Sequence, residues 1–204
     1  MCLRRRLFPA ASILAAAILV TWFPQSLWAQ GSVVSLDPAN TKITFTLGAT
    51  LHTVHGTFLL KRGEVRFDPS TGAATGSIIV DATSAETGNA SRDKNMHTNI
   101  LESQKFPEIV FTPKQVKGSV ASRGKSQVEV LETFRLHGQE HEMTLPVSVE
   151  RGTNGRFDAD VHFPVPYVQW GLKNPSTFVL HVSDTVQLEI HAAGQVSEAT
   201  PPTR

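Results

Sequence analysis

The sequence is poor in the groups that mark several classes of protein. Among its 204 residues there is one cysteine, Cys2, and the 19 Lys and Arg residues barely outnumber the 18 Asp and Glu residues. A near-neutral chain without a Lys/Arg cluster argues against nucleic acid as a partner. A lone cysteine at the second position leaves the rest of the chain without a thiol, which excludes internal disulfides and a thiol nucleophile.

The chain also lacks an apolar run of the roughly 20 residues that a membrane-spanning helix needs. Its apolar run covers residues 9–20, follows three arginines at positions 4–6, and precedes a small residue, Ala29. This is the three-part layout of a secretory signal. We predict a signal peptide over residues 1–29 that is cleaved near Ala29, with an uncleaved anchor as the alternative.

Cleavage at this point removes Cys2 and leaves a mature chain without cysteine. Its length fits one domain with a sizeable core, on which a protein without disulfides depends for its stability. The absence of disulfides favours a bacterial periplasm over a disulfide-rich extracellular space. We therefore predict a periplasmic protein, with secretion as the alternative.

Sequence signatures of catalysis are missing or incomplete. No Gly-x-Ser-x-Gly elbow is present, and the segment that begins His141-Glu142 has Leu145 where a zinc-protease helix needs its second histidine. His137 and His141 flank a predicted hairpin turn, so they are a candidate metal pair, against the alternative of two solvated histidines on a polar turn. We predict a protein that is not an enzyme, has no catalytic residue and binds no metal or other cofactor.

What the chain does have is a period of two. Such alternation is typical of strands with one buried and one solvated face. The clearest run sets three apolar side chains, Val186, Leu188 and Ile190, against Gln187, Glu189 and His191. Turn signals separate the runs at hairpin spacing, at residues 61–63, 68–72, 137–140 and 152–155. About eight antiparallel strands result; closing them into a barrel removes their edges, and a two-sheet sandwich is the competing architecture.

Two segments depart from this alternation. Within residues 91–103, Met96 and Ile100 lie four positions apart among polar residues, which predicts one short amphipathic helix. Residues 195–204 contain two prolines and show no periodicity, which predicts a disordered tail.

Large apolar side chains recur at positions that face the interior. A barrel of eight strands is either filled by side chains or just wide enough for one small ligand. Composition alone favours a dry, filled core, because protein interiors are close-packed. The alternative is a tunnel for an elongated apolar ligand, which Tyr167 and Trp170 either close or merely flank as loop anchors. The candidate lining residues are Ile43, Phe45, Phe58, Phe67, Met96, Ile100, Phe111, Phe134, Phe157, Phe163, Tyr167 and Trp170.

A series of short motifs extends over residues 33–193. The most specific block consists of TSAETG at residues 83–88, Arg92-Asp93, and KFPEIVF at residues 105–111. It is preceded by LDP at 36–38, ITF at 43–45, VHGTF at 54–58 and GEVRFDP at 63–69, and followed by WGL at 170–172 and VSDTVQLEI at 182–190. The content and order of these motifs resemble the YceI-like family of exported polyisoprenoid-binding proteins.

The resemblance implies an all-β, extended, lipocalin-like antiparallel barrel of about eight strands over residues 33–193, with one short α-helix packed at its side. It further implies a long apolar tunnel that holds an isoprenoid chain, a quinone tail or a fatty acid or amide. Arg92 and Asp93 are candidates for contact with a ligand head group, because a guanidinium suits phosphate or carbonyl oxygens. The alternative is a cap and local ion pair at the start of the helix.

We therefore expect an exported carrier or store of a long-chain amphipathic lipid, for which a membrane is only a source of ligand. An exported interaction or stress-response module with a dry core is the alternative. A homodimer stays open, since a barrel edge that is not fully closed can pair across a two-fold axis.

Overall fold

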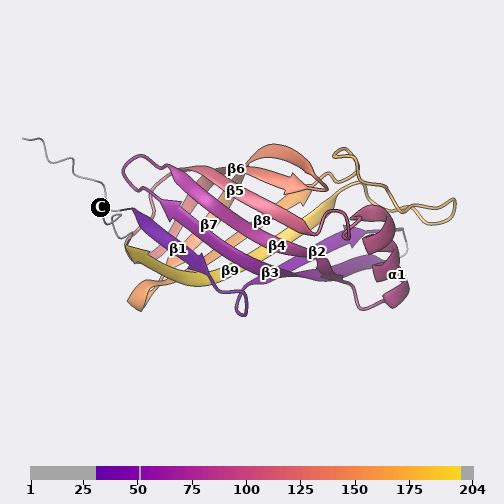
Figure 1. The fold of residues 1–204 in the computed structure, drawn as a ribbon, viewed down its shortest axis with the longest axis horizontal. Helices are drawn as coiled ribbons and strands as arrows, with labels where there is room; N and C mark the ends of the chain where they lie inside the picture. The colour runs from indigo at the N-terminus through magenta and orange to yellow at the C-terminus, as the bar shows by residue number, and fades with distance from the viewer. Residues whose placement is uncertain (1–30, 51, 199–204) are drawn as a thin grey trace, which may run out of the picture.

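The computed structural model describes residues 31–50 and 52–198. The predicted signal peptide and the last six residues of the predicted tail lie outside this range. The described chain consists mostly of strands, which confirms the all-β prediction (Figure 1). The strands are β1 (Ser32–Leu36), β2 (Lys42–Gly48), β3 (Thr53–Phe67), β4 (Ala74–Glu86), β5 (Glu108–Lys117), β6 (Gly124–Leu136), β7 (Gln139–Arg151), β8 (Arg156–Val165) and β9 (Val186–Glu198).

The strands close into a barrel. The order β3-β2-β9-β8-β7-β6-β5-β4 returns to β3 through the antiparallel pairing of β3 with β4. β1 and β2 both lie between β3 and β9, each at a different level, because a turn at residues 37–41 splits what is otherwise one strand position. The ring is therefore eight strands around. A closed barrel, not a sandwich, is the architecture.

Strand β3 corrects one predicted turn. The Lys61-Arg62-Gly63 signal was expected to end a strand, yet β3 continues through it for 15 residues. The pairing with β4 slips by one residue between Leu60 and Arg62, which is how a β-bulge absorbs an extra residue in a long, twisted strand. The strand continues despite the local turn signal because backbone hydrogen bonds to β4 are formed on both sides of the bulge.

The end of β9 corrects a second prediction. Residues 195–198, assigned to a disordered tail, continue the strand and pair with β1, from Gln195 opposite Ser35 to Glu198 opposite Ser32. Periodicity missed them because their order comes from the backbone ladder of β1 and not from an apolar face. Other turn predictions are confirmed, and the β6–β7 hairpin turns through His137 and Gly138, both with the positive φ that a tight hairpin requires.

One helical segment interrupts the strands, as predicted. It consists of α1 (Ala90–Asn95), which runs directly into a π-helical turn (Met96–Ile100). Asn89 caps α1, because its side-chain oxygen accepts a hydrogen bond from the N–H of Arg92 at 3.0 Å. The helix lies at one end of the barrel (Figure 1), where Met96, Ile100 and Leu101 pack against the core. No helix within the described ranges is long and apolar enough to cross a membrane.

Candidate functional site

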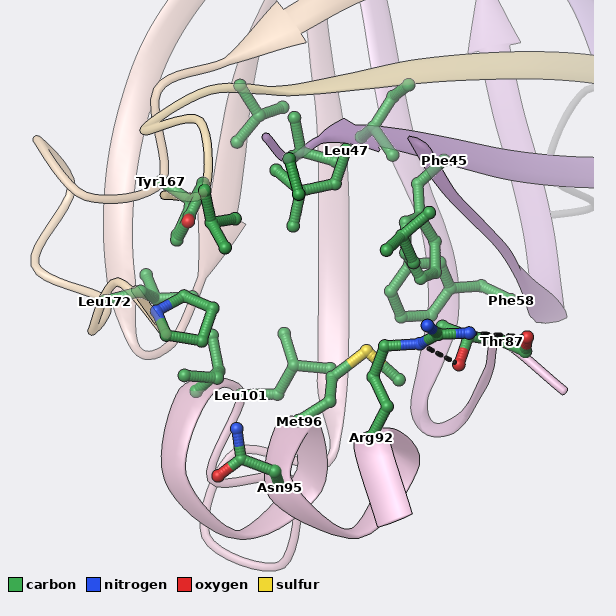
Figure 2. A pocket seen from close by; sticks show the side chains of 18 of the residues that line it. Phe45, Leu47, Phe58, Thr87, Arg92, Asn95, Met96, Leu101, Tyr167 and Leu172 are labelled. Carbon is green, nitrogen blue, oxygen red and sulfur yellow. Dashed lines mark hydrogen bonds between the residues drawn. The ribbon is translucent and has the colours of Figure 1, made fainter. Parts of the chain in front are cut away.

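The barrel interior contains two cavities, one in each half of its length. The larger has a volume of about 610 Å³ and lies in the half that α1 covers (Figure 2). The smaller has a volume of about 250 Å³ and lies in the half that contains β1. Successive inward side chains of one strand can border different cavities. On β2, Phe45 borders the larger cavity and Ile43 the smaller one, and on β3, Phe58 borders the larger and Leu60 the smaller. We call these the α1-end cavity and the β1-end cavity.

Three phenylalanines separate the cavities. Phe111, Phe134 and Phe163 are 5%, 1% and 2% exposed, and their ring centroids lie 4.6 to 6.2 Å apart. Phe134 also borders the α1-end cavity and Phe111 the β1-end cavity. The edge-to-face packing of Phe163 on the other two is a favourable aromatic geometry. We call this buried cluster between the two cavities the aromatic partition.

The wall of the α1-end cavity is apolar except at its mouth. Strands β2, β3, β5, β6, β8 and β9 supply only hydrophobic side chains to it. Gly56, paired with Phe45 across β2 and β3, leaves room for that ring: a Cβ atom at Gly56 would lie 2.2 Å from Phe45 Cζ. Tyr167 turns its hydroxyl out of the cavity and donates to the Ser183 carbonyl at 2.8 Å. Burial and the nearby Asp184 carboxylate raise the pKa of Tyr167 to about 12.

Polar groups gather where the α1-end cavity reaches the surface. They come from the β4–α1 connection and the helix itself, together with His52 from the β2–β3 loop. Arg92 projects from the helix to the cavity edge (Figure 2), and its Nε donates to Thr87 Oγ1 at 2.8 Å and its Nη2 to the Thr87 carbonyl at 3.2 Å. Arg92 forms no ion pair with a described acidic residue, so its remaining N–H groups are free for an oxygen at the mouth.

The other residues around the mouth hold the helix in place. Asp93 accepts hydrogen bonds from both the backbone N–H (2.9 Å) and the hydroxyl of Thr87. His97 bridges the π-helical turn to β4, since its Nε2 lies 2.8 Å from the Ala85 carbonyl and its Nδ1 2.9 Å from the buried Ser103 hydroxyl. Of the two head-group candidates, Arg92 therefore borders the cavity, whereas Asp93 is held by Thr87 and fits the structural alternative.

The β1-end cavity is also apolar, with two charged side chains in its lining, Glu132 and Arg151. Glu132 is 7% exposed, and its Oε1 has no hydrogen-bond partner among the described residues. Burial raises the pKa of Glu132 to about 8, because the charged form is poorly solvated in such surroundings. A carboxyl that is mostly protonated at neutral pH therefore faces an apolar chamber.

The predicted lining residues separate into three groups. Those that border the α1-end cavity are Phe45, Phe58, Met96, Ile100, Phe134 and Tyr167. Those that border the β1-end cavity are Ile43, Phe67, Phe111 and Phe157.

Two predicted lining residues, Phe163 and Trp170, border neither cavity. Phe163 packs against Phe111 and Phe134 in the aromatic partition. Trp170 stacks on His141 with ring centroids 3.9 Å apart and packs against Phe134 at 5.5 Å. These contacts fit the alternative considered for Trp170, that of an anchor for its loop.

Sequence reasoning missed Glu132, although a signal for it existed. On β6 the inward positions are Val128, Val130, Glu132, Phe134 and Leu136. An acid at the centre of an apolar row of period two contradicts the pattern and marks a position with a special role. Leu47, Leu101 and Leu172 of the α1-end cavity were missed as well, the last two because their segments are not strands.

His137 and His141, the pair considered as metal ligands, each contact other side chains. His137 Nε2 lies 3.0 Å from Glu102 Oε2, and its ring packs on Phe106. His141 is instead stacked on Trp170, and burial lowers its pKa. Within residues 31–50 and 52–198 there is no group of three His, Cys, Asp or Glu side chains suited to holding a metal ion.

Comparison with known proteins agrees with this architecture. The family model of the YceI-like domain matches residues 35–193, which is more than half of the chain. The chain belongs to the YceI-like family. The match spans β2 to most of β9 and includes the α1-end cavity and most of the lining of the β1-end cavity, while no curated protein sequence matches.

Solved structures share the fold. A polyisoprenoid-binding domain from Saccharophagus degradans superposes with a TM-score of 0.63 at 16% identity, over 80% of this chain and 98% of that one. BcnA from Burkholderia cenocepacia gives 0.63 at 17% identity, over 78% and 98%. The YceI protein of Campylobacter jejuni gives 0.55 at 17% identity, over 74% and 88%. At such identities the likeness establishes a common fold.

Proposed function

We propose that this YceI-like protein binds one elongated amphipathic lipid without transforming it, and so carries or stores a polyisoprenoid, a quinone tail or a fatty acid or amide. The observation that carries the proposal is the apolar α1-end cavity of about 610 Å³ inside a closed barrel. This volume lies within the ~300–1,000 Å³ that is usual for small-molecule sites.

Energetics favour an occupied cavity over an empty one. An apolar cavity that no ligand fills leaves the side chains of its wall without contacts on one side, and this cost grows with the cavity volume. Water is a poor filler, because a buried water needs two to four polar partners and the strand walls offer none. Each methylene group of a lipid contributes about 0.8 kcal/mol when it leaves water for such a wall.

The distribution of polar groups supports one orientation of the ligand. Its chain lies along β2, β3 and β9 toward the aromatic partition, and its head stays at the mouth beside Arg92 and Thr87. A guanidinium there donates charge-assisted hydrogen bonds to a phosphate, carboxylate or carbonyl oxygen. Binding of this kind uses no nucleophile, metal or redox cofactor, which is consistent with a carrier and not with an enzyme.

Family membership points the same way. The S. degradans relative is described as a polyisoprenoid-binding domain, and the family model covers this chain from β2 to β9. With the signal-like N-terminal sequence, we propose that the protein acts in the periplasm or after secretion, where an apolar lipid needs a soluble carrier.

A loop beside the mouth supports a membrane as the source of the ligand. It projects beyond α1 (orange loop at the right of Figure 1), and its tip carries Phe178, fully exposed, and Val179, 81% exposed. Hydrogen bonds between Thr177 and Leu180 hold the tip closed, and Leu180 itself borders the cavity. The sequence from Val161 to Ser183 contains no acidic residue that an anionic bilayer would repel. We therefore propose that the tip enters the bilayer surface during loading.

The test is whether the protein carries and takes up lipid. Organic extraction of the purified protein followed by mass spectrometry should release a long-chain lipid, and the delipidated protein should take up an added polyprenol or long-chain quinone in about one-to-one ratio. Met96→Trp narrows the cavity from the helix and should lower uptake severalfold. The matched control is Lys94→Trp, on the exposed face of the same helix. Absence of lipid in the extract together with no uptake contradicts the proposal and favours the dry-core module.

A further inference from the structure

Two buried side-chain atoms among the described residues have no hydrogen-bond partner, His141 Nε2 and Glu132 Oε1, and of these two residues only Glu132 lines a cavity. It extends from the inward face of β6 into the β1-end cavity, next to the aromatic partition. The residues opposite Glu132 on the neighbouring strands offer its carboxyl no hydrogen-bond donor: Pro113 on β5 has no N–H, and Met143 on β7 has an apolar side chain. Its Oε1 has no described partner.

No described positive charge neutralises Glu132. Arg151, the other charged side chain of this cavity, lies eight residues along β7 from Met143 and makes no ion pair with Glu132. Lys114 on β5 pairs with Glu142 on the outer face of the barrel. A buried carboxyl without a cation avoids the cost of desolvation by keeping its proton, and burial accordingly raises the pKa of Glu132 to about 8. At neutral pH the group is a hydrogen-bond donor directed into an apolar space.

We infer that the β1-end cavity is a second ligand subsite, in which protonated Glu132 donates a hydrogen bond to a carbonyl oxygen of a ring-sized or amide-sized group. The inference rests on the proposed lipid binding and adds to it a polar recognition element at the opposite end from Arg92. A carboxylic acid kept neutral by an apolar site is a known way of presenting such a donor.

The cavity's size and chemistry select among polar groups. An engineered cavity of about 150 Å³ holds a benzene ring, so about 250 Å³ holds a substituted ring or a short amide segment. A phosphate or carboxylate at Glu132 would lie beside an acid, while Arg151, the cation of this lining, lies eight residues along β7 from Met143, which is opposite Glu132. A primary ammonium brings three donors, of which this wall satisfies one. A neutral carbonyl needs a single donor, and Glu132 is that donor.

The decisive experiment compares ligands that differ only in the carbonyl. Delipidated wild type, Glu132→Gln and Glu132→Leu are titrated at pH 7 with a quinone bearing a decyl chain, with decylbenzene and with a fatty amide. Wild type should prefer the carbonyl ligands to the hydrocarbon. In Glu132→Leu the preference should fall about tenfold, because the ligand carbonyl is then buried without a donor. Glu132→Gln, which keeps an N–H donor, should retain it within about threefold. The quinone and amide arms distinguish a ring from an amide as the natural group.

A pH series and a matched control sharpen the result. Wild-type preference should decline above pH 8, as the carboxyl ionises and loses its donor, while Glu132→Gln should show no such decline. Met143→Leu changes an apolar neighbour across the β6–β7 pair and should leave the preference unchanged.

Two outcomes overturn the inference, and they are distinguishable. If all proteins bind decylbenzene and Glu132→Leu keeps the wild-type preference for carbonyl ligands, the β1-end subsite is wrong while the proposed lipid binding stands. If none of the proteins binds decylbenzene, the quinone or the amide, the proposed function fails and this inference fails with it.

Discussion

The two cavities of the barrel place their charged or ionisable side chains in opposite surroundings. In the α1-end cavity the charged group, Arg92, lies at a mouth open to water and is hydrogen-bonded to Thr87. In the β1-end cavity the acid, Glu132, lies deep among apolar side chains and has an unpartnered oxygen. The same alternating strands build both walls. The location of a polar group relative to solvent, and not the strand pattern, therefore decides whether it is kept charged or forced to be neutral.

The pH dependence of stability gives the largest expected difference between the two ends. In the folded protein Glu132 holds its proton up to a pKa of about 8, whereas its ordinary value is 4.5. Between these values the folded state binds more protons than the unfolded state, so the free energy of unfolding must fall as pH rises. The decline attributable to Glu132 is at most about 4–5 kcal/mol and levels off above pH 8.

Urea unfolding of wild type and Glu132→Gln from pH 5 to pH 9 checks this expectation. Glu132→Gln should become the more stable of the two as pH rises, with the gap widening through the window. All other titrating groups are common to both proteins, so the difference isolates Glu132. A gap that does not change with pH would mean that Glu132 is solvated or paired.

Removal of the aromatic partition tests whether the cavities are separate chambers. Phe134→Ala deletes a ring that is 1% exposed and should lower the free energy of unfolding by about 3–5 kcal/mol. The control Phe178→Ala deletes the same ring from an exposed tip and should change it by less than about 0.5 kcal/mol. Both values come from chemical denaturation. Equal effects of the two variants would show that the partition is not packed.

The mouth of the α1-end cavity is tested through the ligand head group. Arg92→Met keeps the apolar stem and removes the guanidinium, so affinity for a lipid phosphate or carboxylate should fall about tenfold, in line with one charged hydrogen bond. Affinity for a hydrocarbon of the same length should not change. Lys94→Met, on the exposed side of α1, should affect neither ligand in a fluorescence competition assay. An equal loss for both ligands would assign Arg92 to holding the helix alone.

The smallest expected effect concerns loading at the tip. Phe178→Ser with Val179→Ser should slow lipid transfer from vesicles containing anionic phospholipid by about threefold to tenfold, because two apolar side chains no longer enter the bilayer. Uptake of lipid dispersed in detergent should stay at the wild-type level. Leu59→Ser, an exposed apolar residue on β3, is the control. An unchanged transfer rate from vesicles would leave the tip to a protein partner.

The sequence predicted the fold closely where short-range patterns decide it. Alternation along β2, β6 and β9 identified the inward faces, and the His137-Gly138 turn was evident from its residues. It failed where a neighbouring strand overrides the local signal. The apparent turn at Lys61–Gly63 became a bulge because β4 pairs on both sides of it, and residues 195–198 became ordered because β1 pairs with them.

Prediction of the site residues likewise succeeded where local alternation decides and failed where contacts with distant strands decide. Inward aromatic residues such as Phe45 and Phe67 were found from parity, and both border a cavity. Alternation could not predict that Phe163 fills the partition or that Trp170 stacks on His141 beside Phe134, since both contacts depend on distant strands. Alternation also places Glu132 on the inward face of β6. Its unusual position becomes evident only when the residues around it are recognised as one continuous strand with an apolar inward face.

The sequence by itself determined which side chains face inward, because the period of two is a local property of an extended backbone. The tertiary structure alone decided at which level along the barrel those side chains meet. That level is set by the register of eight strands that close on one another. Closure brings Phe111, Phe134 and Phe163 to one height, which divides a single apolar lining into a wide chamber with a polar mouth and a narrow one with a buried acid.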